Sequence, residues 1–283
     1  MDDDVIGLPK FICIGAQKAA TSWLWVMLRQ HPSIWMPPFK EIHYFDYKFI
    51  EENRKWIPVH IRNGVKDVLK WHVESEKVDL FFFKYLVNIA LNNKYDEDWY
   101  KSCFQRKAAR NKLIGDITPE YCQLPVEGIK YMTDYLGKNV KIIYIIRDPL
   151  DRALSQLKMN INRHSSDSRI EDIVKQFAKN TVIIERGDYK SYIPRWEKII
   201  PKNQIHFIPY GIIKNNPTIA LQDLEKFLAV PQFRGYTDTN KRVHKTAQVN
   251  IPDYISKYLS NQLIEQYEFL YSRFSKEFTN NIK

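Results

Sequence analysis

The sequence predicts an α/β protein in which helices flank both faces of a central parallel β-sheet. Short apolar runs rich in β-branched residues alternate along the chain with stretches whose apolar residues recur at helical spacing. The short runs are mostly apolar, which is typical of strands buried on both faces. With 283 residues, of which 44% are hydrophobic, the chain is long enough to bury such a core.

The expected elements follow one another from the N-terminus. The first strand, residues 11–15, ends at a glycine, and a short loop then leads into a helix over residues 21–31. The later elements are a strand at 112–116, a strand at 140–147 with a helix at 150–162, a strand at 204–210 with a helix at 217–228, and a closing amphipathic helix at 251–274. Since the carboxyl ends of parallel strands share one edge of a sheet, we expect a ligand site at that edge.

The segment 47–97 interrupts this alternation. It is polar and aromatic around one apolar run at 80–91, which is long enough for a helix. No repeat or linker-like stretch divides the chain. We therefore expect a single domain over residues 1–283, with 47–97 as an insertion that serves as a lid or a substrate-binding element.

The charge balance indicates an anionic partner. The chain has 43 Lys and Arg against 33 Asp and Glu, a formal net charge of +10. This excess favours nucleic acid, anionic lipid or a phosphorylated or sulfated small molecule. The three cysteines have no close spacing, so they indicate neither a disulfide framework nor a zinc site, and we expect no metal.

The loop after the first strand has the character of an anion-binding site. Small residues where a strand becomes a helix let backbone N–H groups approach an anion, and Lys18 adds a positive charge. An ATP-binding P-loop has its lysine directly before the hydroxyl residue, whereas Lys18 stands three residues before Thr21. We therefore expect a P-loop NTPase-like three-layer fold with a relocated lysine; the alternative is an ordinary turn with a surface lysine. The predicted binding residues of this loop are Ala16, Gln17, Lys18, Ala19, Ala20, Thr21 and Ser22.

A second anchor follows the strand at 140–147. Arg147 emerges at its carboxyl end, and Ser155 lies two turns into the next helix. An arginine can bind a phosphate through two parallel hydrogen bonds, and a serine can add a third. Two anchors at two strand ends suit a nucleotide that carries phosphates at both ends of its ribose.

Together these residues resemble the sulfotransferases that use 3′-phosphoadenosine 5′-phosphosulfate (PAPS). The loop at 15–22 is similar to their 5′-phosphosulfate loop, and Arg147 with Ser155 is similar to their 3′-phosphate site. The resemblance is closest to carbohydrate sulfotransferases of the heparan sulfate type, whose K-E-x-H-[FY]-F-D motif is matched by KEIHYFD at 40–46. Further agreement lies at 98–100, at 116–121 (DITPEY) and at 187–189 ahead of Trp196.

The resemblance implies in-line transfer of a sulfuryl group from PAPS to a hydroxyl or amine, with 3′,5′-ADP as the product and no metal required. The protein's task is then to position both groups and to stabilise charge on the leaving phosphate. Lys18 is placed for this stabilisation, and the backbone amides of 16–21 would hold the 5′-phosphate. Lys241 and Arg242 are similar to the family's basic loop that folds over the nucleotide.

An alcohol acceptor must lose its proton, and a carboxylate whose pKa is raised by partial burial can accept it. The resemblance gives this role to Glu41. His43, two residues further along an extended segment, would face the same side and share or orient that proton. Lys40, Asp46 and Thr118 are expected at the acceptor site. The alternatives for these motif residues are a surface carboxylate paired with Lys40, a core histidine and a capping aspartate.

Two positions depart from the heparan sulfate type. Ser22 stands where an arginine is frequent, and Ile117 stands where a lysine that helps the acceptor site is frequent. A neutral glycan, a glycolipid or a small alcohol is therefore at least as good an expectation for the acceptor as a polyanionic glycan.

Two other function classes stay open at this point. A P-loop ATP-dependent kinase would explain the start of the chain, but it needs a lysine directly before Thr21 and an aspartate that holds a metal ion. A nucleic-acid-binding protein would explain the charge, yet the sequence has no recognition element, so we expect no nucleic-acid partner. No apolar run approaches the ~20 residues of a membrane span, and the first residues are acidic. We expect a cytoplasmic enzyme, with a soluble luminal domain of a Golgi enzyme as the alternative.

Overall fold

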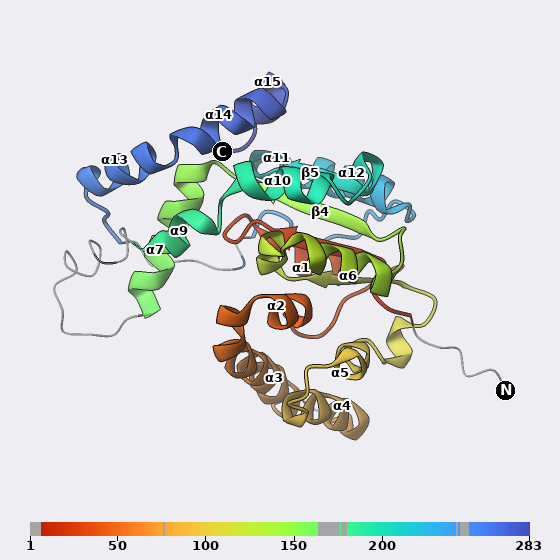
Figure 1. The fold of residues 1–283 in the computed structure, drawn as a ribbon. Helices are drawn as coiled ribbons and strands as arrows, with labels where there is room; N and C mark the ends of the chain where they lie inside the picture. The colour runs from red at the N-terminus through yellow and green to blue at the C-terminus, as the bar shows by residue number, and fades with distance from the viewer. Residues whose placement is uncertain (1–6, 76, 164–175, 177–179, 242, 244–248) are drawn as a thin grey trace.

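A five-stranded parallel sheet forms the centre of the molecule in the computed structural model (Figure 1), which describes residues 7–75, 77–163, 176, 180–241, 243 and 249–283. Its strands are β1 (Phe11–Gly15), β2 (Ile34–Trp35), β3 (Leu113–Ile117), β4 (Lys141–Ile146) and β5 (Ile205–Pro209), in the order β2-β3-β1-β4-β5. Every pairing is parallel, and Phe11 of β1 lies between Gly115 and Lys141. The predicted α/β class with a central parallel sheet is confirmed.

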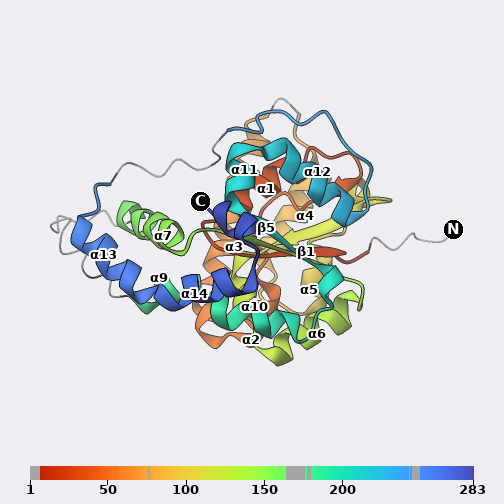
Figure 2. The ribbon, with the colours of Figure 1, turned by 90° about the horizontal axis from the view of Figure 1, so that it is seen from above.

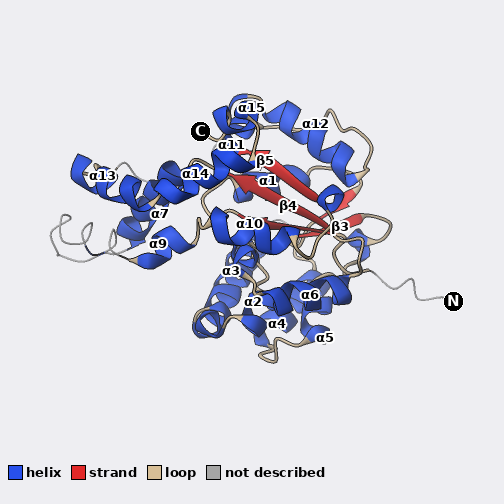
Figure 3. Ribbon diagram, turned by 45° about the horizontal axis from the view of Figure 1, so that its top comes forward, coloured by secondary structure: helices blue, strands red, loops and turns tan. Residues whose placement is uncertain are grey.

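Helices cover both faces of this sheet. Figures 2 and 3 show α1 and α12 on one face and α6 and α10 on the other. The helices are α1 (Thr21–Leu28), α2 (Tyr44–Phe49), α3 (Ile57–Val73), α4 (Leu80–Leu91), α5 (Glu97–Ser102), α6 (Val126–Leu136), α7 (Pro149–Arg163), α9 (Thr181–Glu185), α10 (Tyr189–Glu197), α11 (Tyr210–Asn215), α12 (Pro217–Leu228), α13 (Asp253–Gln262), α14 (Ile264–Arg273) and α15 (Lys276–Asn280). The strands β1 and β4 are almost entirely buried, which explains the apolar runs in their sequences.

The segment 47–97 contributes α3 and α4, which pack against each other below the sheet in Figure 1. Ile57, Ile61 and Val65 of α3 and Leu86 and Ile89 of α4 are buried in the same continuous core as the strands. The insertion therefore shares the core of the sheet. A smaller apolar cluster joins α7, α9 and α13, which lie together beyond one end of the sheet in Figures 1 and 2.

Several elements differ from the sequence prediction: the helix expected over 21–31 ends at Leu28, and helices such as α3, α5, α6 and α10 were not predicted. The strand β2 at the sheet edge was not predicted, because two residues are too few to form a pattern. The closing helix expected over 251–274 is two helices, α13 and α14, that meet at Leu263. Leu263 is buried in the cluster with α7 and α9, so packing sets the position of this break.

Candidate active site

Four chain segments meet where the parallel strands end. The loop 16–20 follows β1, Thr118 follows β3 and Arg147 follows β4, while the segment with Glu41 comes after β2. The backbone N–H of Glu41 donates to the carbonyl of Ile117 at 3.0 Å, which attaches this segment to the end of β3. The edge that the sequence predicted for a ligand thus holds most of the predicted site residues.

The loop after β1 leaves backbone amides available to an anion. The amides of Ala16 and Ala19 donate to backbone carbonyls, so these two do not fit the prediction that all amides of 16–21 hold a phosphate. Those of Gln17, Lys18, Ala20 and Thr21 have no backbone acceptor among the described residues. Such groups at a helix N-terminus form an anion-binding nest, here at the start of α1.

The second predicted anchor contacts this loop directly. Arg147 donates from Nη1 to the carbonyl of Lys18 at 2.6 Å, and its guanidinium lies 4.5 Å from the ring centre of Tyr210. The hydroxyl of Tyr189 bonds to the backbone of Arg147. The Nε of Arg147 is buried without a partner, so the guanidinium keeps donors for a ligand. Ser155 is half-buried on α7, two turns further on.

Lys18 points toward α7. Its Nζ lies 3.6 Å from Sδ of Met159. Burial lowers the pKa of Lys18 to about 8, and the positive charges of Arg147, Arg163 and Lys40 act in the same direction. An anion bound among these groups would favour the charged form of Lys18.

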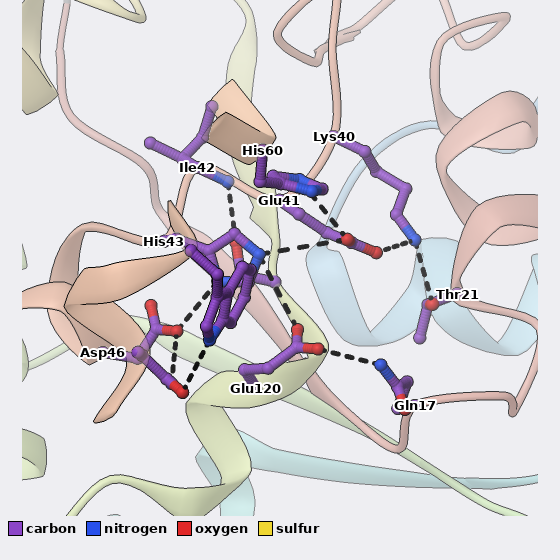
Figure 4. A network of polar contacts seen from close by, with 12 residues as sticks. Gln17, Thr21, Lys40, Glu41, Ile42, His43, Asp46, His60 and Glu120 are labelled. Carbon is purple, nitrogen blue, oxygen red and sulfur yellow. Dashed lines mark hydrogen bonds and ion pairs between the residues drawn. The ribbon is translucent and has the colours of Figure 1, made fainter. Parts of the chain in front are cut away.

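Glu41 forms an ion pair with Lys40 at the centre of the site (Figure 4). The distance from Lys40 Nζ to Glu41 Oε1 is 2.5 Å, and the same ammonium donates to the hydroxyls of Thr21 at 3.3 Å and Ser22 at 3.0 Å. Burial by itself would raise the pKa of Glu41, but Lys40 and the nearby His43 and His60 together lower it to about 2. The expectation of a raised pKa is therefore wrong for this state of the site, because Lys40 is so close.

His43 is fully buried beside Glu41. Its Nδ1 donates to Oδ2 of Asp46 at 2.8 Å, while its Nε2 has no hydrogen-bond partner and lies 3.9 Å from Glu41 Oε2. Burial would lower the pKa of His43, but Asp46 first, and then Glu120 and Glu41, raise it to about 9. A pKa of about 9 favours the imidazolium at neutral pH, and its Nε2 lies 3.9 Å from a carboxylate oxygen of Glu41 and 3.9 Å from one of Glu120.

Asp46 and Thr118 lie behind the site. Both are fully buried. Asp46 accepts from His43 and Asn53, and the hydroxyl of Thr118 accepts from the amide of Ile42 and donates to Asp116. Through these contacts they orient His43 and the segment that carries Glu41, and their place at the acceptor site stays a prediction.

Two side chains that the sequence prediction missed also reach the site. Glu120, on the short helix η3 (Pro119–Gln123), accepts from Gln17 at 3.0 Å and lies 3.4 Å from Arg186 and 3.9 Å from His43. His60 of α3 lies 3.6 Å from Glu41 Oε2. Glu120 belongs to the DITPEY motif, which was a usable signal, whereas nothing in the sequence near His60 indicates that it faces Glu41.

The predicted basic loop is only partly described. Lys241 lies on the surface, where its ammonium is 3.5 Å from Asp238. The segment before it runs along α1, because Trp23 donates to the carbonyl of Thr239 at 2.7 Å. Arg242 lies outside the described residues.

The side chains of Glu41, His43 and His60 place one ligand atom each within 4.8 Å of one another, close enough to share a metal ion. A cation there would compete with the ammonium of Lys40 and with the proton on His43.

Comparison with known proteins gives consistent matches. The family described as Sulfotransferase domain matches residues 8–277. Membrane-associated sulfotransferase kil1 of Dictyostelium discoideum is 27% identical over 163 residues, which cover 57% of this chain and 25% of that protein. Heparan sulfate glucosamine 3-O-sulfotransferase 5 of Mus musculus is 23% identical over 245 residues, which cover 82% of this chain and 56% of that protein. The chain thus spans about a quarter of the first relative and little more than half of the second.

A solved structure shares the fold. The sulfotransferase from Alicyclobacillus acidocaldarius superposes with a TM-score of 0.62 at 20% identity, and the match covers 96% of this chain and 99% of that one. Its fold is the P-loop-like three-layer arrangement predicted here. In the part of the chain that the structure describes, no helix combines the length and the apolar character of a membrane span.

Proposed function

Since the chain belongs to the sulfotransferase domain family, we propose that it transfers a sulfuryl group from PAPS to a hydroxyl or amine. The observation that carries the proposal is the meeting of three parts at one sheet edge: the open amides of the loop, the Arg147 anchor and the Glu41 carboxylate. Family membership sets aside the kinase and nucleic-acid-binding alternatives.

The donor residues suit a nucleotide with two phosphates. The amides of Gln17, Lys18, Ala20 and Thr21 would hold the 5′-phosphate, and Arg147 with Ser155 would hold the 3′-phosphate. PAPS supplies the sulfuryl group and a phosphate leaving group. Lys18 would stabilise the negative charge that grows on this phosphate. Lys241 and Arg242 are proposed to lie over the nucleotide.

Glu41 is the proposed general base. It would accept the proton of the acceptor as the acceptor oxygen or nitrogen bonds to sulfur and the bond from sulfur to the phosphate oxygen breaks. The imidazolium of His43 faces the same carboxylate, so it orients Glu41 and favours its ionised form. His60, whose pKa burial lowers to about 4, is neutral at pH 7 and completes the surroundings of the base.

The acceptor is proposed to be a glycan, a glycolipid or a small alcohol. A relative is named for heparan sulfate glucosamine, which favours a carbohydrate. Ser22 and Ile117 stand at the two positions where a cation is frequent in the heparan sulfate type. Neither side chain carries a charge for an anionic acceptor, and Ile117 is buried. These replacements favour an acceptor with fewer negative charges.

The test uses radiolabelled PAPS with a panel of neutral glycans, glycolipids, alcohols and amines. The wild-type protein should form 3′,5′-ADP and a labelled product. Glu41→Gln should lower turnover by about 10²- to 10⁴-fold, the usual contribution of a general base, while affinity for 3′,5′-ADP stays at or above the wild-type value. Glu52→Gln, at an exposed position, is the control. Unchanged turnover in Glu41→Gln would remove Glu41 from the base role.

A further inference from the structure

Lys40 connects two parts of the site that the proposed function keeps separate. Its Nζ lies 2.5 Å from Glu41 Oε1 and donates to Thr21 and Ser22, the hydroxyl residues at the start of α1. One ammonium therefore bridges the proposed base and the proposed donor loop (Figure 4).

This ion pair works against a general base. A carboxylate held by an ammonium at this distance is a poor proton acceptor, and the pKa of Glu41 is about 2 even though burial would raise it. The other charged or titratable groups that face Glu41 are Lys18 in the loop, His43 on its own segment, His60 on α3 and Glu120 on η3. Among the described residues, Lys40 is the one cation that contacts both Glu41 and the hydroxyls of the donor loop.

We propose that Lys40 is a positioning residue that couples the donor site to the base. This inference rests on the proposed function. When a 5′-phosphosulfate lies at the start of α1, Lys40 moves its ammonium from Glu41 to that anion, and the carboxylate of Glu41 becomes free to accept the acceptor's proton.

The charges favour this exchange. A phosphosulfate carries two negative charges where Glu41 carries one, and Coulomb attraction grows in proportion to charge. The hydroxyls of Thr21 and Ser22 already hold Lys40 beside the helix start, so the ammonium has only a short way to move. The side chain of Lys40 is 16% exposed, which keeps solvent from screening the interaction.

The coupling has a chemical benefit. Without donor, the ammonium of Lys40 offsets the charge of Glu41. The carboxylate therefore stays ionised and has little affinity for a proton. In the transfer step the acceptor's proton goes to Glu41, the acceptor bonds to sulfur, and the electron pair of the broken bond stays on the phosphate oxygen. Lys40 is then next to the phosphate on which this charge develops, where it adds to Lys18.

The first test is structural and needs no acceptor. Crystals of the wild-type protein are compared without ligand and with 3′,5′-ADP. With the nucleotide, Lys40 Nζ should lie within hydrogen-bond distance of a 5′-phosphate oxygen and no longer pair with Glu41. A bound nucleotide with the pair intact would overturn the coupling alone. If 3′,5′-ADP does not bind at all, the proposed function fails and the coupling fails with it.

The second test follows the pH dependence of turnover. The fall of kcat/KM for PAPS at acidic pH, its acidic limb, reports the pKa of Glu41 in the free protein. The acidic limb of kcat reports the pKa of Glu41 in the loaded protein. The kcat limb should lie at least about one pH unit higher in the wild type, because Lys40 has left Glu41. In Lys40→Met the two limbs should coincide, and 3′,5′-ADP should bind roughly 10- to 100-fold more weakly for the loss of one charged hydrogen bond.

Two further variants separate coupling from a structural role. Lys40→Arg keeps the charge and should keep the offset between the limbs. Lys55→Met removes a charge at an exposed position of the short helix η1 (Glu51–Lys55) and should behave as the wild type. Equal limbs in the wild type, or an offset that survives in Lys40→Met, would contradict the proposal.

Discussion

Four residues at the site hold backbone conformations that side chains rarely adopt. Lys18, Ala20, Glu41 and His43 have φ between 56° and 68°, and none of them is a glycine. This left-handed region costs about 1–2 kcal/mol per residue. Such strain persists where surrounding structure imposes it, and it is concentrated at functional sites. Of the eight such non-glycine residues in the described part of the chain, four lie in the donor loop and in the segment of the proposed base.

The pKa of Lys18 leads to a prediction about proton uptake. Lys18 titrates near 8 because burial and neighbouring cations disfavour its charged form. A phosphate favours the charged form, so binding of 3′,5′-ADP should raise this pKa and bind protons. At pH 8, where a phosphate is already fully ionised, we expect uptake of about half a proton per nucleotide. Calorimetry in buffers of different ionisation enthalpy measures this number.

Lys18→Met is the matched variant, because it removes the titrating amine and keeps the chain length. Its uptake at pH 8 should fall close to zero. An unchanged uptake would show that another group carries the protonation and that Lys18 does not face the bound phosphate.

At the scale of elements, the sequence predicted best where local signals agree. The helices at 80–91 and 217–228 have the predicted bounds, because apolar periodicity coincides with a start signal, Asp79 as N-cap of α4 and Pro217 in the first turn of α12. The residues proposed for the donor loop and for the base could be singled out because they lie close together in sequence motifs.

What the sequence did not indicate depends on tertiary packing. The contact of His60 with Glu41 requires that α3 packs against the end of the sheet, and periodicity alone does not fix this packing. The bridge from Lys40 to Thr21 and Ser22 spans 19 and 18 residues, and it forms because β2 and β1 lie in one sheet. The lowered pKa of Glu41 follows from these contacts, so it was also beyond the sequence.

Two glycines give a prediction about element packing. Gly115 of β3 lies opposite Phe11 of β1, and a Cβ there would collide with the buried Phe11 ring. Gly115→Ala should therefore lower the free energy of unfolding by about 1–3 kcal/mol. Gly64 lies inside α3, and a Cβ there meets Phe39 at ordinary contact distance. Gly64→Ala should raise the free energy of unfolding by about 0.5–1 kcal/mol.

Urea denaturation of both variants measures these changes. The two substitutions add the same methyl group. Changes of opposite sign in the free energy of unfolding would therefore show that β1 and β3 pack tightly directly before Asp116. A neutral Gly115→Ala would mean that this part of the sheet can adjust.

At the scale of the whole molecule, the parallel sheet is what assembles the site. It brings segments near residues 15–22, 40–46, 118–120 and 147 to one edge, although they are far apart in the chain. The net charge of +10 suits an anionic donor, because a positive protein attracts it over distance. The central claim is therefore a site for a nucleotide with two separate phosphates, one at the loop and one at Arg147.

The most direct measurement of this claim is a thermal-shift titration at fixed salt with 3′,5′-ADP, 5′-ADP, AMP and Mg-ATP, on the wild type and on Arg147→Ala. We predict that 3′,5′-ADP stabilises the wild type most, by several degrees at saturation. Arg147→Ala should bind 3′,5′-ADP roughly 10- to 100-fold more weakly and lose most of the preference over 5′-ADP. A stronger shift with Mg-ATP, or a preference for 3′,5′-ADP that survives in Arg147→Ala, would contradict the account.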